Sequence, residues 1–203
     1  MADLFVWDAR SARYRDPARG TFVGRAQVKA AVEQVIDGAR SELQAHTRLL
    51  AAGAMDLPAW QAQCAQTLRA LHLASAVIGK GGRSQMTPAD YGRIGARTKD
   101  QYGFLARMAG EIHSGTLDIA NAPAVERRIG LYADAARATY EQSSRDSASN
   151  AAILTWERNV LGSADHCDEC LAATASGRVP IGTLPLPGQR VCKQGCKCSL
   201  VYG

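Results

Sequence analysis

Apolar residues recur at helical spacing through most of the chain. In residues 25–52 they fall on one face of a helix, at positions such as Val28, Val32, Ile36 and Leu43. Comparable stripes predict further helices over residues 57–79, 87–114, 123–143 and 151–162. The polar stretch 143–150, SSRDSASN, is expected to separate the last two. The pattern therefore predicts a mostly α fold, with a helical body of four to five helices.

Residues that typically begin or end helices support these boundaries. Asp56 and Thr87 are N-cap candidates, and each is followed within two positions by a proline that fits the first helical turn. The run GKGGRSQM over residues 79–86 resembles a phosphate-binding or nucleic-acid-binding glycine loop. Its flanks are helical, and its glycine, lysine and serine are in the wrong order for a Walker A loop. It is interpreted as a helix terminator followed by a turn.

Residues 1–24 differ from the rest and are expected to form an N-terminal arm. Arginines alternate there with Trp7, Tyr14 and Phe22, while Asp16-Pro17 and Gly20 are expected to break any regular element. The arm is interpreted as a surface segment anchored by its aromatic side chains. A docking arm for a protein partner or for phosphates is the alternative, since arginine and aromatic residues are favoured in both kinds of interface.

Composition narrows the class of protein. Hydrophobic residues make up 46% and charged residues 21% of the 203 positions, as in an ordinary globular protein. No run of apolar residues is long enough to predict a membrane span. The net charge of +5 permits contact with nucleic acid or acidic protein surfaces without requiring it.

The C-terminal segment carries the chemistry. Five of the six cysteines lie within residues 163–203, as a C-x-x-C pair and a C-x-x-x-C-x-C group: Cys167, Cys170, Cys192, Cys196 and Cys198. Two close clusters joined by a short loop are typical of a tetrahedral zinc site, and zinc would contribute folding energy to a segment with few large apolar residues. The domain organisation follows as the arm (1–24), a helical domain (25–162) and a cysteine-rich metal-binding module (163–203).

The ligand set has alternatives. Cys167, Cys170, Cys196 and Cys198 are the preferred four, with Cys192 as the first candidate for exchange. His166 and His113 are further candidates as substitute ligands. Cys64 lies on the apolar stripe of residues 57–79 and is expected to be a small core residue.

Other uses of the cysteines compete with a structural metal site. Disulfides are less favoured because the opening residues, MADLFVWDARSARYRD, lack the apolar run of a secretion signal. A redox C-x-x-C normally opens a helix in a βαβ unit, which the sequence pattern does not predict here. A zinc deaminase would need an H-x-E motif ahead of its cysteines, and none is present. The sequence therefore favours a structural role, and the protein is not expected to be an enzyme.

The order of these features resembles a known family. A helical body followed by C-x-x-C, a glycine, a proline-rich stretch and C-x-C is similar to the C-terminal region of tailed-phage minor head proteins, the head-morphogenesis family. The matching residues are Cys167, Cys170, Gly177, Cys196 and Cys198, with Ser149, Asn150, Ala151 and Trp156 ahead of them. Cys192 departs from the pattern, since it stands four residues before Cys196, where the family has a histidine three residues before.

The resemblance implies a structural role in a virion. Such proteins associate with portal, capsid or neck proteins, assist head assembly and genome delivery, and occur in the host cytoplasm while the particle forms. The alternative is a zinc-ribbon nucleic-acid-binding protein, because the module is basic and a DNA contact through its cations is plausible on charge grounds. Those cations are Arg178, Arg190, Lys193 and Lys197.

Overall fold

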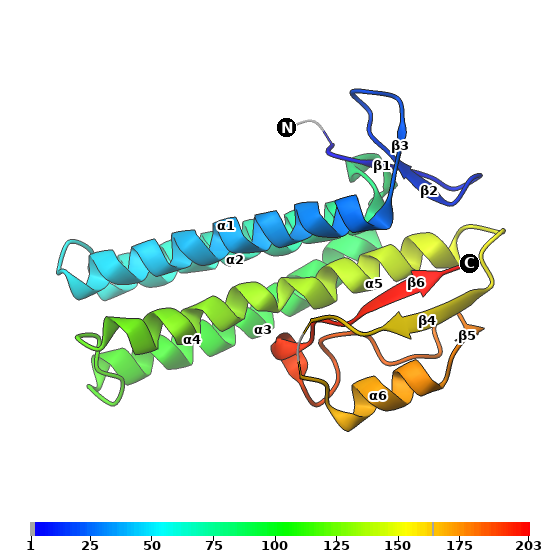
Figure 1. The fold of residues 1–203 in the computed structure, drawn as a ribbon. Coiled ribbons are helices and arrows are strands. Elements are labelled where there is room, and N and C mark those ends of the chain that lie inside the picture. Colours follow the sequence, from blue (N-terminus) through cyan, green and yellow to red (C-terminus); the bar gives the residue numbers. More distant parts are fainter. Residues whose placement is uncertain (1–2, 164) are drawn as a thin grey trace.

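The computed structural model describes residues 3–163 and 165–203, and five long helices form its body (Figure 1). These helices are α1 (Arg25–Ala51), α2 (Leu57–Lys80), α3 (Pro88–His113), α4 (Ala122–Asp134) and α5 (Ala136–Ser149). Helix α2 packs against α1, α3 and most extensively α5, while α1 also packs along α4. The predicted mostly α class and the helix count of the body are confirmed.

The helix ends follow the predicted chemistry. The carboxylate of Asp56 accepts a hydrogen bond from the backbone N–H of Ala59, and Thr87 forms a reciprocal capping box with Asp90. Gly81 ends α2 in the left-handed conformation, with φ of +73°, which a residue with a side chain rarely adopts. The glycine run therefore acts as the predicted helix terminator, followed by the short 3-10 helix η1 (Arg83–Gln85).

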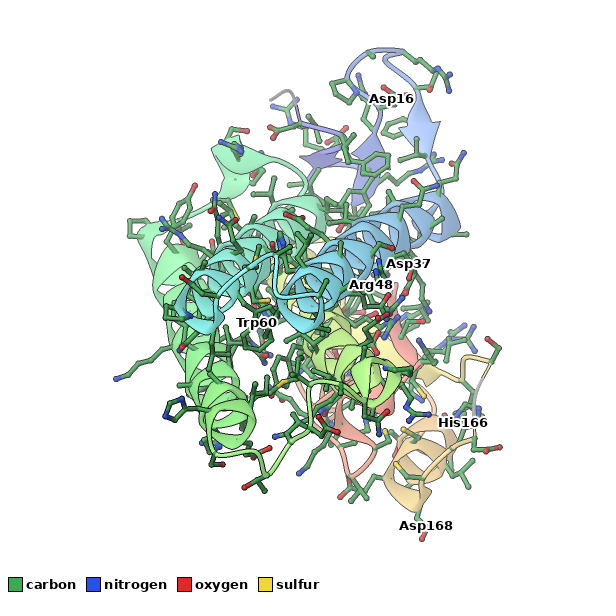
Figure 2. All side chains as sticks on the ribbon, turned by 90° about the vertical axis from the view of Figure 1, so that its left-hand side faces the viewer. Asp16, Asp37, Arg48, Trp60, His166 and Asp168 are labelled. Carbon is green, nitrogen blue, oxygen red and sulfur yellow. The ribbon has the colours of Figure 1, made fainter. Side chains whose placement is uncertain are left out.

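The core of the body is formed by the apolar helix faces that the sequence pattern predicted. It contains Trp60, Cys64 and Leu68 of α2, each completely buried, packed with apolar residues of the other helices. The indole N–H of Trp60 donates to the hydroxyl of Thr47 on α1, so its one polar atom is satisfied. Figure 2 shows Trp60 inside the bundle, far from the C-terminal segment. Cys64 is a core residue, as predicted.

The expected interruption over residues 143–150 does not occur. The break lies earlier, at Ala135 between α4 and α5, and α5 continues through the serine-rich stretch to Ser149. Ser147 donates to backbone carbonyl oxygens, including that of Lys80 at the end of α2, and Ser144 is buried as well. Buried serines are tolerated inside a helix when their hydroxyl groups find acceptors on a neighbouring helix, which a sequence pattern does not reveal.

The N-terminal arm is a small antiparallel sheet, which the sequence did not predict, and Asp16-Pro17 and Gly20 interrupt its strands as expected. Its strands are β1 (Val6–Asp8), β2 (Arg13–Arg15) and β3 (Phe22–Val23), in that order. The proline and glycine lie in the turn between β2 and β3, closed by hydrogen bonds from Asp16 and Gly20. The hydroxyl of Tyr14 donates to the carbonyl of Gly79 at 2.7 Å, so an aromatic residue anchors the arm on the body, as the sequence indicated.

The predicted helix over residues 151–162 is also wrong, because this stretch contains strand β4 (Trp156–Val160). It is the central strand of a second antiparallel sheet, between β5 (Val179–Pro180) and β6 (Ser199–Tyr202). The inward-facing residues of β4 are Glu157 and Asn159, which are buried and polar. A strand with polar residues on its buried face has no apolar alternation to signal it.

The C-terminal module comprises this sheet, helix α6 (Asp168–Ala175) and the short 3-10 helix η2 (Lys193–Gly195). Because β4 is its central strand, the module begins before residue 163. Figure 1 shows the sheet alongside α5, with α6 on the far side of β4. The carboxylate of Glu141 on α5 accepts the backbone N–H of Leu200 on β6 at 3.2 Å, which joins module and body.

None of the helices in the described part of the chain is both long enough and apolar enough to cross a membrane.

Candidate metal centre

Local structure brings the two cysteine clusters into one place. Cys167 is the N-cap of α6 and Cys170 lies in its first turn, so both thiols point from one end of the helix. Cys192 precedes η2, Cys196 follows it, and Cys198 immediately precedes β6. The pairing of β6 with β4 carries the second cluster back to the start of α6.

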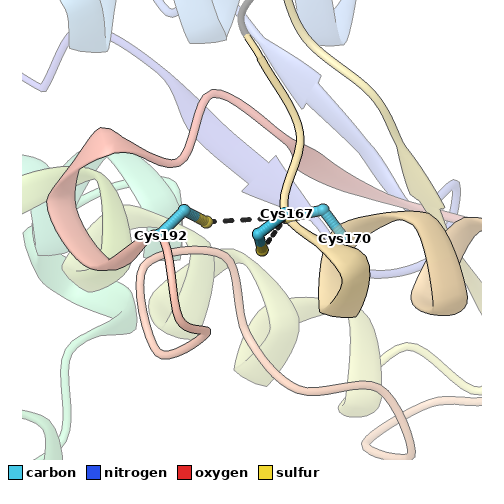
Figure 3. Close-up of side chains that lie close together, drawn as sticks. All are labelled: Cys167, Cys170 and Cys192. Carbon is cyan, nitrogen blue, oxygen red and sulfur yellow. Dashed lines mark hydrogen bonds between the residues drawn. The ribbon is translucent and has the colours of Figure 1, made fainter.

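Cys170 is the centre of the cluster. Its Sγ lies 3.5 Å from that of Cys167, 3.5 Å from that of Cys192 and 3.8 Å from that of Cys196. The sulfurs form two groups of ligand size that share Cys170, one with Cys167 and Cys192 and the other with Cys196 and Cys198. Figure 3 shows the first group, with Cys192 reaching the helix from the opposite loop. All five predicted cysteines therefore lie together, and they could hold a metal ion.

The spacing fits a metal better than a disulfide. Ligands about 2.3 Å from a tetrahedral ion lie about 3.8 Å apart, close to the three separations around Cys170. A disulfide would bring two sulfurs to about 2.05 Å. None of the six cysteines is in a disulfide, and Cys170, Cys196 and Cys198 are buried. A largely buried group of thiols at these separations is suited to a shared cation.

The thiols have contrasting environments. Burial raises the pKa of the Cys198 thiol to about 11. Burial also acts to raise the pKa of Cys196, but hydrogen bonds from the backbone N–H groups of Cys198 and Gly188 outweigh it and lower that pKa. Backbone N–H groups directed at a sulfur favour the thiolate, which is the form that binds metal. Binding a cation at this cluster would therefore release protons from the remaining thiols.

Two residues that the sequence did not single out for this role support the cluster. Arg190 is 2% exposed, and its guanidinium lies 3.6 Å from the sulfur of Cys170 and 2.8 Å from the amide oxygen of Asn159. The Asn159 amide in turn donates to the Thr174 hydroxyl and to the backbone carbonyl of Cys170. A buried cation beside a group of thiolates offsets their negative charge. Arg190 lies two residues before Cys192, and this proximity is the only sequence signal for its role.

Of the two histidines that the sequence offered as substitute ligands, one lies beside the thiols and the other lies far from them in the chain. The Nδ1 of His166 lies 3.9 Å from the sulfur of Cys198, so it borders the cluster. His113 is exposed at the end of α3 and belongs to neither ligand group. Figure 2 shows His166 together with Asp168 at the outer end of the module. Of the two substitute ligands, only His166 is placed near the thiols.

The basic residues of the module differ in their exposure to solvent. Arg190 is buried beside Cys170 and is not available for a DNA contact. Arg178 and Lys193 are exposed, although the guanidinium of Arg178 lies over the ring of Trp156, with its carbon 4.4 Å from the ring centroid. The basic surface is therefore smaller than the sequence suggested.

The strands around α6 do not have the arrangement that a thioredoxin-like redox site requires. Cys167 and Cys170 do open a helix, as in oxidoreductases, but the strands on either side of α6, β4 and β5, are antiparallel neighbours. A thioredoxin-like site has a helix that crosses between parallel strands. The arrangement holds three other thiols against Cys170 instead, which suits a shared ion.

Comparison with protein-family models, with curated proteins and with solved structures finds no match in any of the three.

Proposed function

We propose that this protein is a structural minor head protein of a tailed phage, whose C-terminal module is held together by a zinc ion. The observation that carries the metal part is the convergence of four other thiols on Cys170, three of them at sulfur–sulfur separations of 3.5–3.8 Å. The resemblance of Cys167, Cys170, Cys196 and Cys198 to the head-morphogenesis pattern supports the virion part.

Zinc is the metal that this donor set fits best. Thiolates are soft ligands that favour zinc, copper(I) or iron–sulfur clusters over magnesium or calcium. A set of three or four thiolates with a bordering histidine is typical of structural zinc sites, in which protein ligands fill every position. The ion would supply cross-links between α6 and the loop that carries Cys192 and Cys196, and no bound water is needed for that role.

The residues around the site act as a scaffold. Glu169 on α6 accepts the backbone N–H of Val191 at 2.7 Å, which fixes the loop next to the first cluster. Arg190 and Asn159 tie the same loop to β4. With the thiols bound to one zinc ion, these contacts would give the module a rigid outer surface on a helical body. We propose that portal, capsid or neck proteins dock there during assembly in the host cytoplasm and remain bound in the virion.

Elemental analysis tests the metal part directly. The reduced protein is expected to bind zinc, and Cys170→Ser is expected to remove most of it because both ligand groups use this residue. Cys64→Ser is the matched control, since this cysteine is buried in the helical body and belongs to neither ligand group. A reduced wild-type protein without bound metal would contradict the proposal.

Co-expression tests the virion part. The protein is expected to co-purify with a portal or capsid protein encoded by a neighbouring gene, and to be present in purified particles. The alternative is a zinc-ribbon DNA-binding protein, which the exposed Arg178 and Lys193 favour. Tight DNA binding with a steep salt dependence, without any portal or capsid partner, would decide for that alternative.

A further inference from the structure

A cavity at the surface lies away from the cysteines, between α2 and α3. Its volume is about 490 Å³, within the range of ligand-binding clefts. Apolar and aromatic side chains line it: Leu73 from α2 and Tyr91, Ile94 and Tyr102 from α3. Tyr91, which lines the cavity, is 48% exposed.

The charged residues that line this cavity are all cationic. Arg69 stands on the α2 wall and Lys99 on the α3 wall. Among the residues that the structure describes, neither forms an ion pair or a side-chain hydrogen bond, whereas Arg93 on the same helix α3 is paired with Asp90 and Asp146. Two unpaired cations on opposite walls of an apolar cleft make it complementary to a ligand with an apolar centre and negative flanks.

Gly95 of α3 lines the cavity and is exposed. A methyl group added at this position would meet nothing within 4 Å. Glycine in a helix interior is less favourable than alanine by about 1 kcal/mol, so a side chain here would stabilise α3. Because Gly95 belongs to the lining of the cleft, a larger side chain here is a means of narrowing the cleft without damage to the fold.

We propose that this cleft binds one face of an acidic amphipathic helix from a partner protein. A helix that lies in the groove between α2 and α3 would insert apolar residues from successive turns, the usual mode of helix-in-groove recognition. Acidic residues that flank its apolar stripe on both sides would pair with Arg69 and Lys99. A second copy of this chain is the poorer occupant, because its net charge of +5 adds repulsion. The proposal does not depend on metal binding.

The test uses an unbiased probe and the full-length chain. A display library of short helical peptides is selected against the wild-type protein, and the selected peptides are synthesised for titration against three proteins. These are the wild type, Gly95→Leu, and Gly110→Leu as the matched control. Gly110 is on the same helix, has nothing within 4 Å of its added methyl position, and does not line the cavity.

The expected result is enrichment of peptides with apolar residues at helical spacing flanked by aspartate or glutamate. Their affinity should fall by about tenfold or more in Gly95→Leu and remain unchanged in Gly110→Leu. Arg69→Ala with Lys99→Ala should weaken binding and reduce its dependence on salt. Selected peptides that bind Gly95→Leu as tightly as wild type, or that carry no acidic bias, would overturn the proposal. Circular dichroism of each variant verifies that the helical body is intact.

Discussion

The guanidinium of Arg190 lies 3.6 Å from the sulfur of Cys170, inside the C-terminal module. The same guanidinium also donates to the amide oxygen of Asn159 and to the carbonyl oxygen of Pro185. It therefore joins the loop, the central strand β4 and the thiol cluster in a single contact set. A basic residue that the sequence offered as a nucleic-acid contact instead lies buried against the cysteine cluster.

Arg190→Gln is expected to weaken zinc binding by about tenfold to a hundredfold, the usual effect of losing a residue that supports metal ligands. The reason is that a buried positive charge beside the thiolates disappears. Competition with a chromophoric chelator measures the affinity. Arg158→Gln is the matched control, because Arg158 is exposed on β4, next to Asn159. Equal affinities for the two variants would contradict a role for Arg190 at the site.

Removal of the metal by a chelator should loosen the module and leave the body folded. The module has only a small apolar cluster of its own, centred on Ala173, Leu184, Leu186 and Leu200. The body has a large one that includes Trp60 and Leu68. Hydrogen exchange is therefore expected to lose protection in α6, β4 and β6, with α1 and α2 unchanged. Loss of the far-ultraviolet helical signal on chelation would show that the two parts are not separable in this way.

Gly79→Ala should destabilise the protein although alanine is the better helix former. A methyl group on Gly79 would lie 2.6 Å from the carbonyl oxygen of Tyr140 and 2.8 Å from the Cβ of Ser143, so α2 and α5 would have to separate. Overpacking of this kind lowers the free energy of unfolding by about 1–3 kcal/mol. Gly110→Ala, where nothing lies within 4 Å, should instead raise it by up to about 1 kcal/mol. Urea denaturation of both variants checks the difference in sign.

Cys64→Ala should leave the metal content unchanged and lower the free energy of unfolding by about 1 kcal/mol, because it removes a fully buried sulfur. Burial raises the pKa of the Cys64 thiol to about 12, so a thiol reagent at neutral pH should modify it only after unfolding. Metal analysis and labelling kinetics test the two statements. Zinc loss from this variant alone would mean that the sixth cysteine had been misassigned.

Glu141→Gln should stabilise the protein at neutral and higher pH. Burial raises the pKa of the Glu141 carboxyl from 4.5 to about 7, so the folded state holds a proton that the unfolded state has released over that range. The stability that Glu141 contributes is therefore complete below about pH 4.5 and is lost as the pH rises to about 7. The size of the effect is on the order of 3 kcal/mol.

Glutamine keeps an oxygen that can accept the Leu200 N–H, so it removes the charge and keeps the link to β6. The free energies of unfolding of wild type and Glu141→Gln are expected to be similar near pH 4.5 and to diverge as the pH approaches 7. A difference that does not vary with pH would show that the carboxyl is not protonated in the folded protein.

The sequence by itself determined the helical body and the five thiols of the candidate metal centre. Apolar stripes with a period of 3.6 residues require a buried face, so Val32, Leu43 and Leu68 specify helices whatever their neighbours are. The caps at Asp56 and Thr87 are equally local, since each acts on backbone groups within its own first turn. The spacing of the cysteines limited the thiol ligands to the five in one segment, with His166 and His113 as the other candidates.

Only the tertiary structure decided which residues complete the module. Glu157 and Asn159 are buried in β4 because Arg145 and Arg190 meet them from α5 and from the C-terminal loop. These partners are distant in sequence, so the pattern of β4 alone resembles an exposed or helical stretch. Cys170 is central for the same reason: the β4–β6 pairing, and not the cysteine spacing, brings the second cluster to its sulfur. Long-range hydrogen bonds and charge pairs make polar positions suitable for burial. The pattern of apolar and polar residues along the sequence does not reveal such partners.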